Sequence, residues 1–296
     1  MIYQVNHKTT YRYSIPVSFS HHLLHLMPRR CEHQTCHRVI LDLLPSPSAK
    51  TTRVDYFGNP VIDITLQDQH TQLILNARSV IEVSPRPMPA PHDSAPWDDI
   101  YPRLYGDTSE TGLDAIQYVF ASPYTIARTD LAGFARPHFP PGRPVLEGAL
   151  DLTRDIYENF RYDSFATTVS TPVDEVFEAR HGVCQDFAHL QIACLRALKI
   201  PARYVSGYLL TRPPEGQSRL IGADASHAWL SVWCPANGWI DIDPTNNLIV
   251  SDEHITLTWG RDYGDVSPIT GAIFGGGAHT IEVAVDVVPK PSASNE

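Results

Sequence analysis

The stretch GVCQDFAHL, residues 182–190, predicts the start of a helix with a cysteine in its first turn. Gly182 frees the backbone to turn, and a helix is expected to begin at about Cys184. Apolar residues recur at helical spacing from there to Leu198, and Pro201 marks the end of the pattern. The apolar stripe consists of Phe187, Leu190, Cys194 and Leu198. The pattern therefore predicts a helix whose first turn holds a cysteine.

The position of Cys184 distinguishes it from the other four cysteines. The first turn of a helix carries unpaired backbone N–H groups and the positive end of the helix dipole, and both favour a thiolate. The thiolate, rather than the thiol, is the nucleophile in cysteine chemistry. Most cysteines are instead small buried apolar residues, and Cys194 on the stripe and Cys234 beside a turn fit that description. Cys184 is therefore the candidate nucleophile.

A thiolate nucleophile works with an imidazole that protonates the leaving amine, and His227 is the candidate for that role. It lies near the start of an alternating strand, SHAWLSVW, at residues 226–233. By the period of two it shares a face with Trp229, Ser231 and Trp233. The chain has 14 histidines, so a purely structural histidine in this place is the alternative.

Two aspartates in GWIDIDPTNN, residues 238–247, are candidates for orienting that imidazole. Asp241 and Asp243 fall on the same face of one strand. A turn at Pro235–Gly238 brings this strand beside the strand of His227. A loop with an odd number of residues puts His227 and Asp243 on one face, whereas a four-residue loop puts them on opposite faces unless a bulge intervenes. The residues alone leave the choice between the two aspartates open.

Three regions of different character follow one another along the 296 residues, and typical domains of about 100–200 residues favour two domains. Residues 1–85 hold short β-rich runs with turn punctuation, which predicts an N-terminal all-β, sandwich-like domain. Residues 86–144 begin with many prolines and are expected to form a linker with irregular or helical structure. Residues 145–296 hold the helices and strands of a catalytic domain, with a last strand at 280–288.

Composition narrows the class of protein. The formal charge is −10 with histidine neutral, and lysines and arginines are scattered, so we expect no nucleic-acid partner. No run reaches about 18 apolar residues, the length of a membrane span, so we expect no membrane partner. The start of the chain shows no signal peptide, and the five cysteines are widely spread. These features predict reduced thiols and a cytoplasmic location.

The segment CEHQTCH, residues 31–37, contains cysteine and histidine, which are zinc ligands. The spacing of Cys31 and Cys36 is outside the tightest finger spacing, and no second Cys/His pair follows at the usual interval. We therefore expect a strand or surface segment here, and neither a metal nor another cofactor in the protein. Metal binding by Cys31–His37 is the alternative.

Taken together, GVCQDFAHL, ARYVSGYL, SHAWLSVW and GWIDIDPTNN resemble the bacterial transglutaminase-like superfamily, whose members are often described as cysteine proteases. The order of Cys, His and the Asp of an Asp-Pro-Thr segment matches the family's catalytic triad. The resemblance assigns these roles to Cys184, His227 and Asp243 and favours Asp243 over Asp241. The segment GRDYGDVSPITG and the opening TTYRYSIPVSFSHHLLHLMPR, with the later DYFGNP, also resemble these bacterial proteins.

The resemblance implies an α+β fold, in which a papain-like or transglutaminase-like core follows the N-terminal β-domain. It implies acyl transfer through a thioester on Cys184, with the Cys184 backbone N–H as one oxyanion-hole donor and Tyr162 or Gln185 as candidates for the second. Hydrolysis of a peptide or isopeptide-like bond is the first expectation, because water is always available. Transamidation, in which a protein glutamine acyl group passes to an amine, and a non-catalytic binding scaffold are the alternatives. The expected partner is a peptide or protein substrate.

Overall fold

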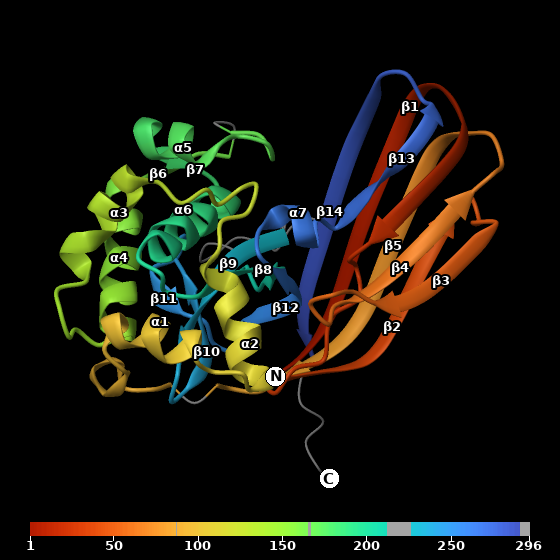
Figure 1. The fold of residues 1–296 in the computed structure, drawn as a ribbon. Helices are drawn as coiled ribbons and strands as arrows, with labels where there is room; N and C mark the ends of the chain where they lie inside the picture. The colour runs from red at the N-terminus through yellow and green to blue at the C-terminus, as the bar shows by residue number, and fades with distance from the viewer. Residues whose placement is uncertain (87, 165–166, 212–225, 291–296) are drawn as a thin grey trace, which may run out of the picture.

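The structure, a computed structural model, describes residues 1–86, 88–164, 167–211 and 226–290. Figure 1 shows a strand-rich body beside a second body, in which helices surround another sheet. The fold is therefore mixed α+β, with a strand-rich N-terminal domain, as predicted.

β1 (Ile2–Leu24) organises the strand-rich domain. Its first half lies between β5 and β14, and its second half pairs with β4 and β13. A single strand of 23 residues thus begins the region for which the sequence predicts short β-rich runs. Inward-facing residues of the sheet, among them Val17 and Leu75, form a buried apolar core. The other strands of this sheet are β2 (Gln34–Leu44), β3 (Ala49–Val54), β4 (Pro60–Leu66), β5 (His70–Val83), β13 (Ile269–Gly275) and β14 (His279–Lys290).

The two C-terminal strands belong to this first sheet. β13 and β14 pair with β1, so the strand expected at 280–288 completes the N-terminal domain and is not part of a catalytic unit running from 145 to 296. Val285 and Val287 of β14 are fully buried in one cluster with Val5 of β1. An alternating pattern predicts a strand but not its partner, which is why the division based on sequence differs here.

Residues 86–144 contribute to the core and are more than a linker. Ile100, Leu131 and Phe139 are fully buried in the main apolar core of the second body. Pro96 directly precedes the first helix, where a proline does not disturb helical hydrogen bonds. None of the helices in the described residues is long and apolar enough to cross a membrane. The elements here are η1 (Pro91–Asp93), α1 (Trp97–Tyr105), α2 (Glu110–Ile116), η2 (Gln117–Val119), α3 (Thr129–Ala135) and η3 (Arg136–His138).

A five-stranded antiparallel sheet in the order β11-β10-β9-β8-β12 forms the centre of the second body (Figure 1). α6 (Cys184–Ala197) packs against β8 and β9 and begins at the predicted residue. Its side chains are buried along almost its whole length, because α3, α4 and α5 cover it from outside. The remaining elements are α4 (Val145–Asn159), β6 (Arg161–Tyr162), α5 (Val173–Ala179), β7 (His181–Gly182), β8 (Ala202–Leu209), β9 (Ser226–Cys234), β10 (Gly238–Asp243), β11 (Leu248–Ile249), β12 (His254–Gly260) and α7 (Tyr263–Val266).

A buried cluster joins the two sheets. Tyr3 and Ile81 from the strand-rich domain pack against Tyr208 of β8, together with residues of β12 and β14. Gln34 adds polar bonds across the same boundary, since its Nε2 donates to Thr256 O at 2.7 Å and its Oε1 accepts from Thr256 N at 2.8 Å. The strand-rich domain therefore supports the edge of the sheet from which the candidate site is built.

Candidate active site

The start of α6 is held by Asp186. Its Oδ2 accepts from the backbone N–H of Val183 at 2.8 Å and from Thr167 Oγ1 at 2.6 Å. Gly182 is needed beside it, because a Cβ at that position would lie 2.7 Å from the Asp186 carboxylate. Cys184 is thereby the first residue of the helix and partly buried, at the end where unpaired N–H groups gather.

The hairpin of β9 and β10 places His227 and Asp243 on one face of the sheet. Gly238 pairs with Cys234, so the connecting loop consists of the three residues 235–237. The φ angle of Gly238 is +73°, a left-handed conformation that glycine adopts without steric cost. The odd loop length is the case in which the two side chains share a face, and no bulge is required.

His227 and Asp243 are in direct contact, with ring Nε2 2.7 Å from Asp243 Oδ2. Nδ1 is then the ring nitrogen left for Cys184, which lies near enough to His227 to raise its pKa. Burial alone would lower the pKa of His227, but its hydrogen bonds with Asp243 and Cys184 outweigh burial and raise the pKa to about 10. The structure thus brings the three predicted residues together.

Asp243 is fully buried, and several donors surround its carboxylate. Its Oδ2 also accepts from Asn246 Nδ2 at 2.7 Å and lies 3.1 Å from His254 Nε2, while Oδ1 accepts from the backbone N–H of Thr245 at 2.9 Å. Burial alone would raise the pKa of Asp243, but the bonds with His227 and His254 hold it well below its ordinary value. The carboxylate is therefore ionised and fixed in position.

Asn246 and His254 are absent from the predicted site. Asn246 stands three residues after Asp243 in the quoted Asp-Pro-Thr segment, so its proximity was available as a signal. His254 begins β12, which is separated from β10 in the sheet by two strands, β9 and β8. Its ring meets that of Trp229 edge to face, at 5.1 Å between centroids, and only the folded sheet brings it to Asp243.

Asp241 takes a different position and has its own partners. Its carboxylate pairs with Arg86 and accepts hydrogen bonds from Trp229 Nε1 at 3.1 Å and from Ser231 Oγ. These bonds occupy both oxygens, and among the described residues none connects Asp241 to His227. Asp243 and not Asp241 is therefore the aspartate that contacts His227, although the alternating pattern of the strand left the two equivalent.

The other cysteines lie in surroundings that keep them as thiols. Cys194 and Cys234 are fully buried, and burial raises the pKa of both, that of Cys234 to about 12. Cys31 and Cys36 are partly buried, and burial raises their pKa values as well. Cys184 differs from these four because it is the first residue of a helix and lies near His227.

Two side chains were candidates for a second oxyanion-hole donor. Gln185 Nε2 donates to Val169 O at 3.0 Å, so its amide is committed to that carbonyl. Tyr162 stands on β6, directly beside Gly182 of the parallel strand β7. Partial burial and, after it, the nearby Cys184 raise the pKa of Tyr162. Cys184 therefore affects Tyr162, as it also affects the buried Tyr204.

The Cys31–His37 segment does not assemble the ligands of a zinc site within the described residues. There, the single group of three potential ligands consists of His227, Asp243 and His254, whose ligand atoms lie within 4.8 Å of one another. The hydrogen bonds to Asp243 already account for those distances. Cys31 instead forms a backbone bridge with Gln34, and His33 lies 3.7 Å from Glu32.

The raised pKa of His227 predicts that stability falls at alkaline pH. The folded protein binds the second ring proton more tightly than the unfolded chain, in which the histidine pKa is about 6.5. The added stability is complete below about pH 6.5 and is lost as pH rises through about 10. Urea unfolding of wild type and His227→Gln should give free energies whose difference shrinks as the pH rises over that range. A difference independent of pH would contradict the assignment.

His254 is expected to act through Asp243, as a positioning residue. His254→Leu removes one donor from a buried carboxylate, which should slow alkylation of Cys184 by iodoacetamide at pH 6 by roughly tenfold. The remaining carboxylate is more basic, so the pH at which His227 loses its second ring proton should rise. His254→Gln keeps an amide donor and should restore both properties. A slower rate with an unchanged pH profile in His254→Leu would indicate a purely structural residue.

Two comparisons of sequence cover most of the chain. Residues 3–82 match the bacterial transglutaminase-like N-terminal region, and residues 135–244, which include all three site residues, match the transglutaminase-like superfamily. An uncharacterised protein of Mycobacterium bovis is 42% identical over 300 residues, which cover 97% of this chain and 92% of that protein. Another from Mycobacterium leprae is 32% identical over 291 residues, covering 96% and 97%.

Two further comparisons concern proteins whose names include an activity. A protein-glutamine gamma-glutamyltransferase of Pseudomonas aeruginosa is 34% identical over 102 residues, which are 32% of this chain and 15% of that protein. The crystal structure of a candidate cysteine protease from Cytophaga hutchinsonii superposes with a TM-score of 0.74 at 23% identity and covers 99% of this chain and 92% of that one. The second likeness establishes the fold.

Proposed function

Because the chain belongs to the transglutaminase-like superfamily and carries its bacterial N-terminal region, we propose that it is an enzyme that transfers acyl groups from amides through a thioester on Cys184. The observation that carries the proposal is the linked set of side chains at the start of α6. There the Cys184 thiol lies near the His227 imidazole, and the imidazole is 2.7 Å from a buried carboxylate. This arrangement is the one that activates a cysteine nucleophile.

The proposed reaction starts from a Cys184 thiolate beside a protonated His227, whose raised pKa keeps the proton on the ring. The sulfur then attacks the amide carbonyl carbon, and the carbonyl oxygen takes the negative charge beside the Cys184 backbone N–H. When the C–N bond breaks, His227 returns the proton to the leaving amine. Water or a second amine next attacks the thioester, so that either a carboxylic acid or a new amide leaves and the thiol is restored.

Hydrolysis of a peptide or isopeptide-like bond is our first choice for the second half of the reaction. Water is present at about 55 M in any compartment, whereas an amine acceptor needs its own binding site. Transamidation is the second candidate, and the likeness to the Pseudomonas aeruginosa gamma-glutamyltransferase over 102 residues favours it. A peptide or protein substrate and a cytoplasmic location belong to the same proposal, and fractionation of producing cells tests the location.

A glutamine-containing peptide incubated with a fluorescent primary amine separates the two reactions. Incorporation of the amine supports transamidation, whereas release of ammonia or a shorter peptide without incorporation supports hydrolysis. Cys184→Ala run in parallel identifies any background reaction. If neither reaction occurs with a broad peptide library, the alternative of a non-catalytic scaffold gains support.

Alkylation by iodoacetamide at pH 6 tests the scaffold alternative directly. Cys184 of an enzyme should react rapidly at this pH, and the rate should fall in a His227→Ala variant, because the imidazole stabilises the thiolate. Mass spectrometry of the labelled protein identifies the modified residue among the five cysteines. A slow reaction that does not depend on His227 would support the scaffold.

Tyr162 is proposed as the second donor to the oxyanion. Tyr162→Phe removes the hydroxyl and keeps the ring, so it should lower kcat about 10²-fold, the usual effect of losing one oxyanion-hole donor. KM should change little, because the donor acts on charge that develops only in the transition state. Tyr157→Phe is a matched control, since that side chain is similarly exposed on α4. Equal kcat values for both variants would remove Tyr162 from the mechanism.

A further inference from the structure

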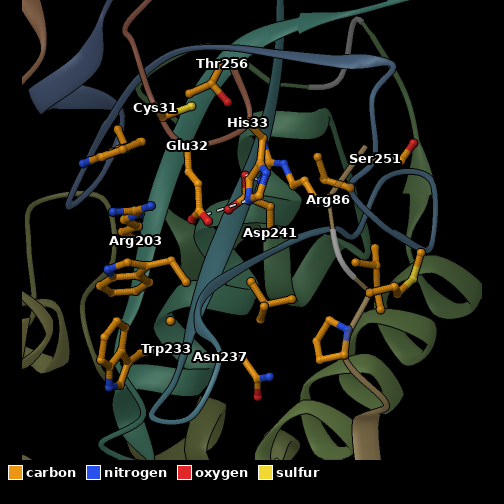
Figure 2. A pocket seen from close by; sticks show the side chains of 18 of the residues that line it. Cys31, Glu32, His33, Arg86, Arg203, Trp233, Asn237, Asp241, Ser251 and Thr256 are labelled. Carbon is orange, nitrogen blue, oxygen red and sulfur yellow. Dashed lines mark hydrogen bonds and ion pairs between the residues drawn. The ribbon is translucent and has the colours of Figure 1, made fainter. Parts of the chain in front are cut away.

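A cavity of about 520 Å³ is lined by none of the three candidate catalytic residues. Figure 2 shows the side chains that do line it. It is bounded by the segment at Cys31–His33 of the strand-rich domain and by residues of β8, β10 and the chain around Val250. Arg203 and Asp241 line it and alternate along their strands with residues that pack toward α6, such as Tyr204 and Ile242. Its volume is within the range of small-molecule sites.

Arg203 is the unusual residue in this cavity. Its guanidinium lies between two indoles, 4.4 Å from the ring centre of Trp239 and 3.7 Å from that of Trp259. The side chain is 6% exposed, and its Nε donates to Ser231 Oγ at 3.3 Å. Among the described residues no carboxylate lies within ion-pair distance of it. A buried cation without a paired anion is costly, so the arrangement favours an anion from outside the described chain.

The other charges that line the cavity already have partners. Arg86 pairs with Asp241, which also accepts from Trp229 and Ser231. Glu32 is exposed and lies 3.7 Å from the ring of His33. These interactions leave Arg203 without an ion pair of its own, although Asp241 attracts it from a longer distance. The planar donor groups of Arg203 match the geometry of a carboxylate.

The rest of the lining is mainly apolar and suits an apolar group of about the size of an aromatic ring. Trp233 meets Trp239 at 5.3 Å between ring centres, and together they form an aromatic wall. Met88, Ile240 and Val250 also line the cavity. Burial of an apolar body against these side chains would add affinity that a small inorganic anion cannot obtain.

We propose that this cavity binds a small organic acid, with its carboxylate on Arg203 and an apolar or aromatic body against Trp233 and Trp239. The site is separate from Cys184, His227 and Asp243, none of which lines the cavity. The proposal does not depend on the proposed enzymatic function, since it concerns binding only.

Isothermal titration of the wild-type protein with phenylbutanoate, phenylbutanol and phenylbutylamine tests the proposal. The three compounds share one body and differ in the charge of the end group. We expect the acid to bind at least about tenfold more tightly than the alcohol, and the amine to bind more weakly than the alcohol. Equal binding of all three, or an acid that binds more weakly than about 10 mM, would overturn the proposal.

Two variants locate the binding. Arg203→Met should remove the preference for the acid over the alcohol. Since this buried substitution could unfold the protein, Met88→Glu provides a second test, because it adds a negative charge at an exposed lining position and should weaken the acid severalfold without affecting the alcohol. Val54→Glu makes the same change at a comparably exposed residue on β3. Equal effects of the two glutamate variants would place the acid elsewhere and overturn the proposal.

Discussion

Cys184→Ala should abolish turnover while leaving the fold intact. The thiolate forms the bond on which both halves of the proposed reaction depend, and its loss in comparable enzymes lowers kcat by at least about 10⁴-fold. The substitution removes one sulfur atom from a partly buried position, so α6 should keep its start, which is held by the bonds of Asp186. Measurement of kcat with a cleaved peptide, alongside circular dichroism, tests both expectations.

Cys194→Ala is the matched control for that experiment. It makes the same substitution ten residues further along the same helix, in a side chain that is fully buried and away from His227. It should cost about 1 kcal/mol of stability through the cavity it leaves, with turnover within a factor of a few of wild type. Comparable losses of activity in the two variants would mean that the helix, and not the Cys184 sulfur, supports the reaction.

The parts of the site that sequence predicted are those whose geometry is local. The helix from Cys184 follows from a glycine, an apolar stripe and a terminating proline, all within twenty residues. The strands of His227 and Asp243 follow from alternation and one turn. What the pattern could not supply was the length of the loop between them, because Gly238 belongs to either the turn or the strand. The structure assigns it to β10, and that assignment brings His227 and Asp243 to one face.

The parts that sequence missed depend on pairing between distant strands. His254 reaches Asp243 because β12 and β10 lie in one sheet, and β14 reaches β1 across nearly the whole chain. An alternating segment has the same pattern whichever strand it pairs with. The helices within 86–144 were obscured by prolines, which here stand mostly before the helices or between them. Only the packing of Ile100 and Leu131 into the core identifies them as part of the second body.

The same distinction explains the two aspartates. Asp241 and Asp243 are equivalent by alternation along the strand. The family resemblance favours Asp243, and in the structure Asp243 is the one that contacts His227. The physical difference lies in their neighbours. Arg86, which neutralises Asp241, comes from the chain just after the strand-rich domain, and His254, which supports Asp243, comes from β12. Asp241 therefore takes its partner from a residue far away in sequence, whereas Asp243 takes one from another strand of the same sheet.

His227→Ala should lower kcat by about 10²–10⁴-fold without unfolding the protein. The protonated ring is proposed to stabilise the Cys184 thiolate and to give its proton to the leaving amine, and alanine can do neither. The fold should persist because Asp243 keeps its bonds with His254, Asn246 and the backbone of Thr245. The buried carboxylate would thus not be left without partners, which is the usual cause of large destabilisation.

A control with the same chemistry at another place makes the His227→Ala result specific. His138 Nε2 lies 2.9 Å from Asp155 Oδ2, so His138→Ala also removes a histidine from an aspartate, but in a part of the molecule built from η3 and α4. It should leave kcat within a factor of a few and change the free energy of unfolding by about 1 kcal/mol. If His227→Ala and His138→Ala reduce turnover equally, the loss reflects general destabilisation. If only the first does so, and its alkylation by iodoacetamide at pH 6 is slow as well, then one imidazole both stabilises the thiolate and carries the proton to the leaving group.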